Sequence, residues 1–220
     1  MTRKKALISP DGHTLDCWET FSDSPVAQII ILQEIFGVTD QLKEVASNLV
    51  AHGFSVLIPQ LFDRHAPNTV IPFSEAERGR VIMASLNPDE TFTDIQTVIA
   101  YAQKSNLPVF IVGFCWGGGL AFRSGQIARV SGTISFYGTR LAEYLSDDMI
   151  SPALLHFGKL DPLTPPDLVS SVAERYPDIE LYEYDSGHAF ANQHRDTYCA
   201  SATQLAMDRT IGFIKSKLER

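Results

Sequence analysis

The sequence has little cysteine, and none of it is spaced as metal sites and disulfide frameworks require. The 220 residues include three cysteines, Cys17, Cys115 and Cys199, which lie far apart and form no C-x-x-C pair. An odd number of scattered cysteines argues against a disulfide scaffold and fits a reducing compartment. We therefore expect a cytoplasmic protein that holds no metal.

Long apolar runs and excess positive charge are also lacking. The longest apolar stretch, IIILQEIFGV at residues 29–38, is too short and too polar to span a bilayer, and no apolar run follows the basic N-terminus to make a signal peptide. Eighteen Lys and Arg against 26 Asp and Glu give a formal net charge of −8. Such a chain is poorly suited to nucleic acid or to an anionic membrane surface, so we expect neither as a partner.

The chain contains no internal repeat, low-complexity tract or linker, and its composition is that of a globular protein. We expect a single domain, residues 1–220. Short apolar runs predict strands at residues 4–10, 14–21, 27–33, 54–59, 109–114, 132–138, 153–158 and 179–184, the first two joined as a hairpin by the Asp11-Gly12 turn. Amphipathic segments predict helices at residues 40–52, 74–85, 88–104, 117–127, 166–175 and 196–218.

This alternation predicts the α/β class, a mostly parallel twisted sheet with helices on both faces. Ligands bind such sheets beyond the carboxyl ends of the strands. Four residues of catalytic type, Glu34, Cys115, Asp161 and His188, each follow a different predicted strand. We therefore expect them to gather at one edge of the sheet.

The segment around Cys115 reads Gly-Phe-Cys-Trp-Gly, the G-x-C-x-G form of a nucleophile elbow. The residue at the apex of such a turn has a strained backbone, and side chains two positions away would collide with the neighbouring strand and helix, which explains Gly113 and Gly117. The following helix directs its N-terminus at the sulfur and favours the thiolate. The order Cys115, Asp161, His188 is also the nucleophile–acid–histidine order of α/β-hydrolases.

Seven segments in sequence order give the chain a family resemblance. It resembles the dienelactone hydrolases, a branch of the α/β-hydrolase fold. The matching segments are DGHT (11–14), QEIFGV (33–38), RHAPNT (64–69), GFCWGGGLAF (113–122), FYG (136–138), HFGKLDP (156–162) and SGHAFAN (186–192).

The resemblance implies a role for each residue of the expected site. Cys115 would attack an ester or lactone carbonyl, His188 would act as base and then as acid, and Asp161 would orient the histidine. The backbone N–H groups of Ile35 and Trp116 would form the oxyanion hole.

The resemblance also implies a gate for the thiol. Glu34 would keep the resting thiol protonated and swing to an arginine when substrate arrives. Arg80 is the expected partner, and Arg78 is close enough in sequence to be the alternative. The gate would also protect the thiol from oxidation between turnovers.

One position departs from the family pattern. Where the family has a second arginine after the catalytic histidine, for the substrate carboxylate, this chain has Asn192. An asparagine provides hydrogen bonds but no charge, so a bidentate carboxylate clamp is lost. The expected substrate contacts are therefore Tyr137, in the FYG segment, and Asn192.

The sequence predicts a hydrolase of small carboxylic esters or lactones, of the dienelactone type, that works through a thioester acyl-enzyme without a cofactor. A monomer or a weak homodimer is expected. Two alternatives remain open: hydrolysis of another electrophile, such as a thioester or an activated phosphoester, or a binding or sensing role without turnover. Cys17, Cys199 and His156 are interpreted as core residues, and Asp161 has a capping role before Pro162 as its alternative.

Overall fold

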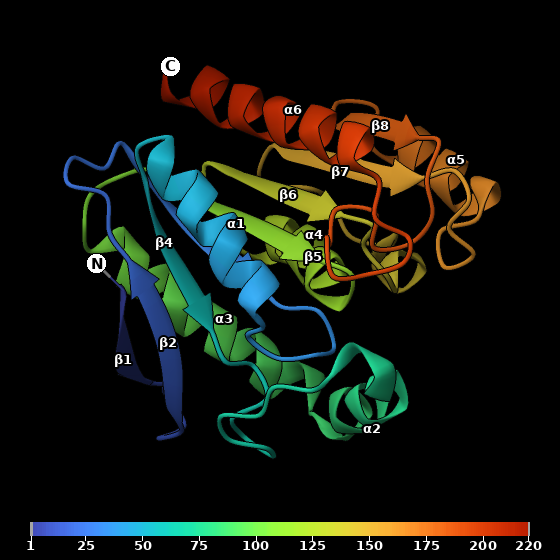
Figure 1. Ribbon diagram of the computed structural model, residues 1–220. Coiled ribbons are helices and arrows are strands. Elements are labelled where there is room, and N and C mark those ends of the chain that lie inside the picture. Colours follow the sequence, from blue (N-terminus) through green and yellow to red (C-terminus); the bar gives the residue numbers. More distant parts are fainter. Residues whose placement is uncertain (1, 220) are drawn as a thin grey trace. The chain divides into compact units, whose positions relative to one another are not determined.

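The computed structural model describes residues 2–219, which group into a first compact unit ending at Val109 and a second beginning at Phe110 (Figure 1). Each unit contains four strands and several helices. The prediction of one domain over residues 1–220 stays a prediction. None of the helices within residues 2–219 is long and apolar enough to cross a membrane.

The first unit has its strands in the order β1-β2-β4-β3, with β1 and β2 antiparallel, β2 and β4 antiparallel, and β3 and β4 parallel. Its elements are β1 (Thr2–Ile8), β2 (Thr14–Thr20), β3 (Ala27–Leu32), α1 (Asp40–Ala51), β4 (Phe54–Pro59), η1 (Phe73–Glu75), α2 (Ala76–Ser85) and α3 (Pro88–Gln103). β3 and β4 are almost continuously apolar because both of their faces are covered.

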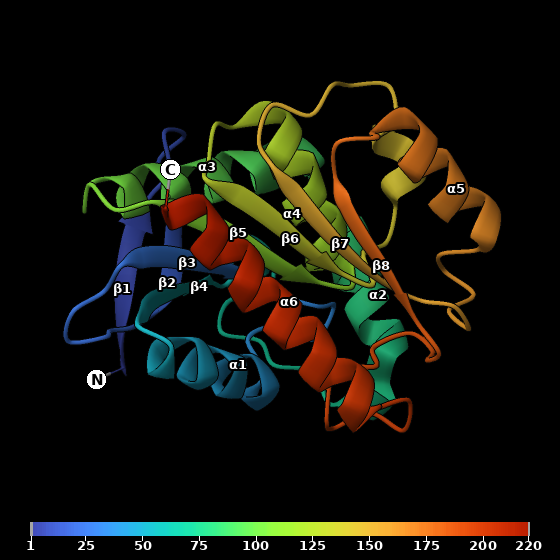
Figure 2. The ribbon, with the colours of Figure 1, turned by 90° about the horizontal axis from the view of Figure 1, so that it is seen from above.

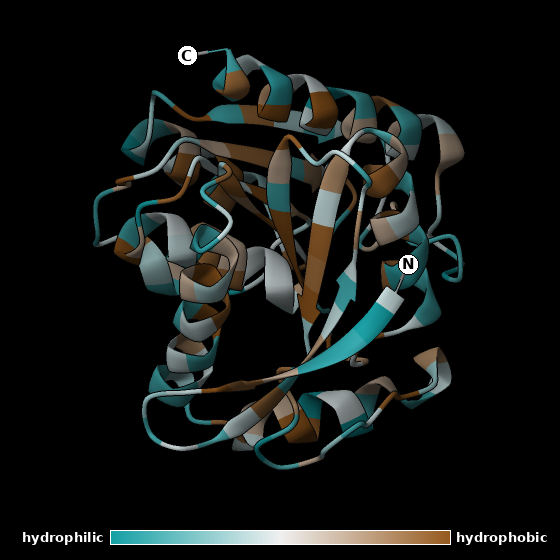
Figure 3. Cartoon of the chain, turned by 90° about the vertical axis from the view of Figure 1, so that its left-hand side faces the viewer, coloured by the Kyte–Doolittle hydropathy of each residue, from teal (hydrophilic) through white to brown (hydrophobic). Residues whose placement is uncertain are grey.

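β1 is an edge strand of the first unit and carries charged side chains, unlike the nearly apolar β3 and β4. Figure 3 shows the strand at the N-terminus as hydrophilic. Arg3 donates to the buried Glu19 of β2 at 2.7 Å, and Lys4 lies 5.1 Å from the ring centroid of Trp18. Charged side chains on an edge strand oppose pairing with another chain, so these residues have a structural explanation.

Arg64 connects the β1–β2 hairpin to α3 through ion pairs with both. Its guanidinium donates two hydrogen bonds of 2.8 Å to the buried carboxylate of Asp94 and forms an ion pair of 2.7 Å with Asp11. Ser9 donates a further hydrogen bond to Asp94 at 2.5 Å. Arg64 of the RHAPNT segment therefore centres a partly buried ion-pair network that connects the turn after β1 to α3.

The second unit has its strands in the order β5-β6-β7-β8, and all of its neighbouring strands are parallel. Its elements are β5 (Val109–Phe114), α4 (Trp116–Ile127), β6 (Gly132–Phe136), η2 (Leu141–Tyr144), β7 (Ala153–Gly158), α5 (Pro166–Arg175), β8 (Glu180–Tyr184) and α6 (Ala200–Leu218). The parallel arrangement places the carboxyl ends of these four strands at one edge.

Helices cover both faces of the second sheet, with α4 on one and α6 on the other (Figure 2). Successive residues of β6 point to opposite faces of the sheet. A Cβ on Gly132 would lie 2.7 Å from Phe213 of α6, while Thr133 faces Gly125 of α4. A mostly parallel sheet with helices on both faces is what the sequence predicts, and the prediction is confirmed.

The predicted elements are present, with differences at their ends. The helix predicted from residue 196 begins at Ala200, because residues before it bond back to the loop that follows β8. The short turn η2 was not predicted. The buried face of α1 is formed by Gln41, Leu42, Ala46 and Leu49, while Val45 and Val50 are only half-buried.

Candidate active site

Cys115 stands at the bend between β5 and α4 with φ 54° and ψ −116°. A non-glycine residue in this backbone conformation is strained, and such strain is found at functional sites. The bend requires glycine two residues earlier, because a Cβ on Gly113 would lie 1.9 Å from the carbonyl oxygen of Gly117. The predicted nucleophile elbow is therefore present in the backbone.

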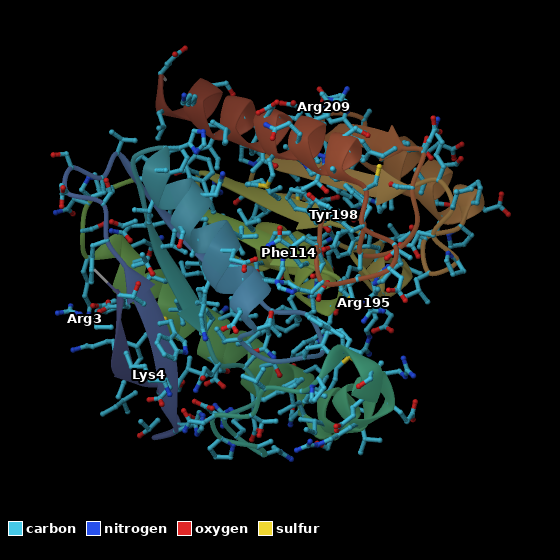
Figure 4. The ribbon with its side chains drawn as sticks, viewed as in Figure 1. Arg3, Lys4, Phe114, Arg195, Tyr198 and Arg209 are labelled. Carbon is cyan, nitrogen blue, oxygen red and sulfur yellow. The ribbon has the colours of Figure 1, made fainter. Side chains whose placement is uncertain are left out.

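Backbone hydrogen bonds hold the elbow in place. The N–H of Cys115 donates to the carbonyl of Phe136 at 3.0 Å, and the carbonyl of Cys115 accepts from the N–H of Thr139 at 3.1 Å. Phe114, labelled in Figure 4, stacks on Phe136 with ring centroids 4.8 Å apart. The sulfur is thus presented by a bend that two chain segments fix.

Asp161 lies on the loop after β7, and its carboxylate has two partners. Oδ1 accepts the backbone N–H of Leu163 at 2.8 Å, and Oδ2 lies 2.7 Å from Nδ1 of His188. The residue is 3% exposed. The alternative of a helix cap does not apply, because the next helix, α5, begins only at Pro166.

His188 connects Asp161 to Cys115. Its Nε2 lies 3.1 Å from Sγ of Cys115, while Nδ1 faces Asp161. Burial by itself would lower the pKa of His188, but the hydrogen bonds to Asp161 and Cys115 outweigh it and raise this pKa to about 10. The two hydrogen bonds thus favour a proton on the imidazole beside the sulfur.

The loop between β8 and α6 carries His188 and folds back on itself. Ala189 has φ 60°, in the left-handed region, and Phe190 is fully buried. The hydroxyl of Thr197 donates to the carbonyl of His188 at 2.5 Å, and the N–H of Cys199 donates to the carbonyl of Phe190 at 3.0 Å. Arg195 and Tyr198 of the same loop are labelled in Figure 4.

The two expected substrate contacts of this unit are both buried. Tyr137 follows β6 with φ 40°, and its ring lies edge-to-face against His188 at 5.2 Å between centroids. Asn192 is 0% exposed, and its side-chain oxygen accepts the N–H of His194 at 3.0 Å. Tyr137 thus lies next to the histidine, and Asn192 supports the turn that follows it.

The remaining expected site residues belong to the first unit. Glu34 and Ile35 lie in the segment just after Gln33, which follows the end of β3 at Leu32, and Glu34 is 2% exposed. α2 packs on this segment, since a Cβ on Gly79 would lie 2.1 Å from the carbonyl oxygen of Ile35. Arg80 and Arg78 are exposed and pair with Glu77 at 2.9 Å and Glu75 at 3.2 Å.

The other cysteines and His156 have different surroundings. All three cysteines are free thiols, and Cys17 is buried, with a pKa raised by that burial. The prediction of a core position is wrong for Cys199, which is partly exposed immediately before α6. His156 is a core histidine, as predicted: Nδ1 lies 2.8 Å from the hydroxyl of Tyr184, and Nε2 lies 3.0 Å from that of Thr210.

Comparison with known proteins identifies relatives over nearly the whole chain. The model of the dienelactone hydrolase family matches residues 18–218. A carboxymethylenebutenolidase of Pseudomonas putida is 31% identical, with 97% of this chain and 96% of that protein covered. Carboxymethylenebutenolidase 1 of Cupriavidus pinatubonensis is 30% identical, with coverages of 87% and 86%.

Solved structures share the fold at lower identity. A structure described as a putative dienelactone hydrolase from Klebsiella pneumoniae matches with a TM-score of 0.86 at 19% identity, over 98% of each chain. A dienelactone hydrolase-like promiscuous phosphotriesterase from metagenomic libraries matches with a TM-score of 0.75 at 19% identity, over 97% of this chain and 98% of that one. These likenesses show the α/β-hydrolase fold.

Proposed function

Because this chain belongs to the dienelactone hydrolase family and is a carboxylic ester hydrolase, we propose that it cleaves small esters or lactones with Cys115 as nucleophile. The observation that carries the proposal is the line of contacts from Sγ of Cys115 through the imidazole of His188 to Asp161, at 3.1 Å and 2.7 Å. Such a line is the arrangement that nucleophilic acyl transfer needs.

In the first half of the proposed reaction, the thiolate of Cys115 attacks the carbonyl carbon and the carbonyl π pair moves to oxygen. The tetrahedral intermediate then collapses, the C–O bond breaks, and Nε2–H of His188 gives its proton to the leaving oxygen. In a lactone the leaving oxygen stays attached to the acyl group. Asp161 holds the imidazole in the tautomer that this proton transfer requires.

In the second half, His188 takes a proton from water, and the resulting hydroxide attacks the thioester carbonyl. The C–S bond breaks and the thiolate is regenerated as the acid leaves. Deacylation is the step that most needs the base, because a thiolate attacks readily without help.

We propose that the backbone N–H groups of Trp116 and Ile35 stabilise the oxyanion of both tetrahedral intermediates. Trp116 is the first residue of α4 and follows Cys115 directly, so its N–H lies at the elbow beside the proposed nucleophile. Ile35 lies in the segment after β3, beyond the carboxyl end of the strand, where α/β sheets bind ligands.

We propose Glu34 as the gate of the thiol, with Arg80 or Arg78 as its second partner. The support is local: Glu34 is buried, and the two arginines flank Gly79, whose backbone lies against Ile35. A Glu34→Gln variant should lack the carboxylate that keeps the thiol of Cys115 protonated. Cys115 should therefore react faster with iodoacetamide in the absence of substrate. An unchanged labelling rate would contradict the gate.

Tyr137 and Asn192 are the proposed substrate-binding residues. Tyr137 is favoured because its ring contacts His188, and Asn192 is favoured because it lies four residues after His188. The absence of a charged side chain at position 192 favours substrates without a carboxylate at that place. We further propose a cytoplasmic monomer or weak homodimer that acts on a small molecule without a cofactor.

The test compares initial rates on a p-nitrophenyl acetate-type ester and on a dienelactone, for the wild-type protein and for Cys115→Ala. Loss of both activities in the variant, with its fold unchanged by circular dichroism, is the expected result. Wild-type turnover in Cys115→Ala would overturn the mechanism. Cys199→Ala is the matched control, because it removes a partly exposed thiol outside the elbow.

A second candidate substrate class is an activated phosphoester, which the same nucleophile could attack at phosphorus. The similar fold of the promiscuous phosphotriesterase favours including it. Hydrolysis of paraoxon that is lost in Cys115→Ala would support this candidate, and turnover of the carboxylic ester alone would exclude it.

A further inference from the structure

The carbonyl oxygen of His188 accepts a hydrogen bond of 2.5 Å from the hydroxyl of Thr197, nine residues further along the same loop. This carbonyl belongs to the peptide group that joins His188 to Ala189. Its direction is set by ψ of His188 and φ of Ala189. A donor fixed on this oxygen therefore limits rotation on both sides of the peptide.

The restraint acts where the backbone is strained. Ala189 has φ 60°, and a residue with a Cβ loses roughly 1 kcal/mol in the left-handed region. Turning the peptide between His188 and Ala189 would relieve this strain, and a displacement of the His188 Cα that accompanies the rotation would move the imidazole. The distances to Cys115 and Asp161 then depend on what prevents the rotation.

The side chain of Thr197 also lies near Gly187, the residue before the histidine. Its methyl carbon lies 3.6 Å from the position that a Cβ would take on Gly187. The chain that follows is held as well, because the N–H of Cys199 and the hydroxyl of Thr203 both donate to the carbonyl of Phe190, at 3.0 Å and 2.9 Å. The returning half of the loop thus runs along its outgoing half, up to the start of α6.

We propose that Thr197 is a positioning residue, whose hydroxyl holds the peptide after His188 and thereby keeps the imidazole between Cys115 and Asp161. This inference rests on the proposed catalytic role of His188. Thr197 is exposed and does not belong to the reacting groups, so its action is through the histidine alone. The role of Thr197 was not predictable from the sequence, because contacts between two halves of the same irregular loop follow no periodic spacing.

The experiment separates the hydroxyl from the methyl of Thr197. Thr197→Val keeps the shape and removes the donor, while Thr197→Ser keeps the donor and removes the methyl. Thr93→Val is the matched control, since Thr93 is a partly exposed threonine that donates to the carbonyl of Asp89 at 2.9 Å within α3. All four proteins are compared in ester hydrolysis and in the low-field ¹H NMR signal of the Nδ1–H of His188.

For Thr197→Val we expect a kcat lowered about tenfold to a hundredfold, since a misplaced catalytic group costs rates of this order, with KM changed less than about twofold. Its Nδ1–H signal should shift or broaden. Thr197→Ser should stay within about threefold of wild type in kcat, because the donor remains. Wild-type kcat and an unchanged signal in Thr197→Val would overturn the proposal, as would equal losses in the valine and serine variants.

The two readouts keep this inference distinguishable from the proposed function. If wild-type protein hydrolyses ester in a Cys115-dependent way and Thr197→Val matches it in both readouts, only the role of Thr197 is wrong. If wild-type protein shows no such turnover, the proposed function fails, and the Nδ1–H signal alone decides: a change in Thr197→Val supports the positioning role and no change overturns it.

Discussion

The backbone N–H of Leu163 donates to Oδ1 of Asp161 at 2.8 Å, and so leaves Oδ2 of the same carboxylate to face His188. The two oxygens are therefore not equivalent. One fixes the orientation of the carboxylate, and the other meets the imidazole. This division determines what an amide would do at the same place.

We predict that Asp161→Asn lowers kcat by roughly a thousandfold to ten-thousandfold while KM changes little. The N–H of Leu163 requires an acceptor, so the amide oxygen of the new side chain would occupy the position of Oδ1. The amide NH₂ would then face His188. An NH₂ that donates to Nδ1 places the single proton of the neutral imidazole on Nε2. Nε2 can then no longer accept a proton from the thiol or from water.

Steady-state kinetics on the p-nitrophenyl ester measure this effect. Asp185→Asn is the control, because Asp185 is an exposed carboxylate on a neighbouring loop, paired with Lys159 at 2.8 Å. A kcat within tenfold of wild type in Asp161→Asn would show that Asp161 does not set the tautomer of His188.

The charge of His188 gives a second prediction. Since the hydrogen bonds to Asp161 and Cys115 raise the pKa of His188 to about 10, the imidazole should keep its second proton well above neutral pH. Removal of the sulfur in Cys115→Ala should lower this pKa, because one of its causes is lost. Two-dimensional NMR of the imidazole nitrogens between pH 5 and 11 measures both pKa values, and titration of His188 near neutral pH in the wild-type protein would contradict this prediction.

The fold and the core of the site were predictable because their signals are local. Continuous apolar strands alternating with amphipathic helices determine a parallel sheet, and glycines flanking Cys115 determine a tight bend. The carboxyl ends of parallel strands meet at one edge, so Cys115, Asp161 and His188 could be placed together before any distance was known.

The parts that sequence reasoning missed depend on contacts between distant residues. Residues 196–199 carry a helical pattern, but bonding of Thr197 and Cys199 to the histidine loop competes with the helix, which therefore begins at Ala200. The sequence shows that residue 192 is polar, but it does not show that the side-chain oxygen of Asn192 accepts the N–H of His194. Side-chain acceptors of this kind leave no periodic trace in a sequence.

Arg64 gives a prediction of stability that is separate from the site. Arg64→Met should lower the free energy of unfolding by about 3–5 kcal/mol, because the carboxylate of Asp94, 1% exposed, would lose its charged partner. Urea denaturation at pH 7 measures the loss. Lys43→Met, which removes an exposed ion pair with Asp40, should cost less than about 1 kcal/mol.

The double variant Arg64→Met, Asp94→Leu distinguishes a lost ion pair from lost packing. Replacing both charges by apolar side chains removes the unpaired carboxylate, so most of the stability should return. A double variant as unstable as Arg64→Met would mean that the stem of the arginine, rather than its charge, supports this contact between the hairpin and α3.

His156 gives the last prediction, on the stability of the protein in acid. Burial, followed by the nearby charge of Arg209, lowers the pKa of His156 to about 3, from an ordinary value near 6.5. The folded state is thus neutral at this residue where the unfolded state takes up a proton. The contribution to stability is fully present above pH 6.5 and is lost as the pH falls toward 3, at about 1.4 kcal/mol per pH unit.

His156→Gln removes this titration while keeping polar atoms near Tyr184 and Thr210, so the free energy of unfolding should fall less steeply between pH 6 and 4 in the variant than in wild type. The comparison uses slopes, which a uniform loss of stability in the variant leaves unchanged. His52→Gln, an exposed substitution after α1, should retain the wild-type slope. Equal slopes in His156→Gln and wild type would mean that His156 accepts a proton in the folded protein, and that its hydrogen bonds to Tyr184 and Thr210 rearrange to accommodate the charge.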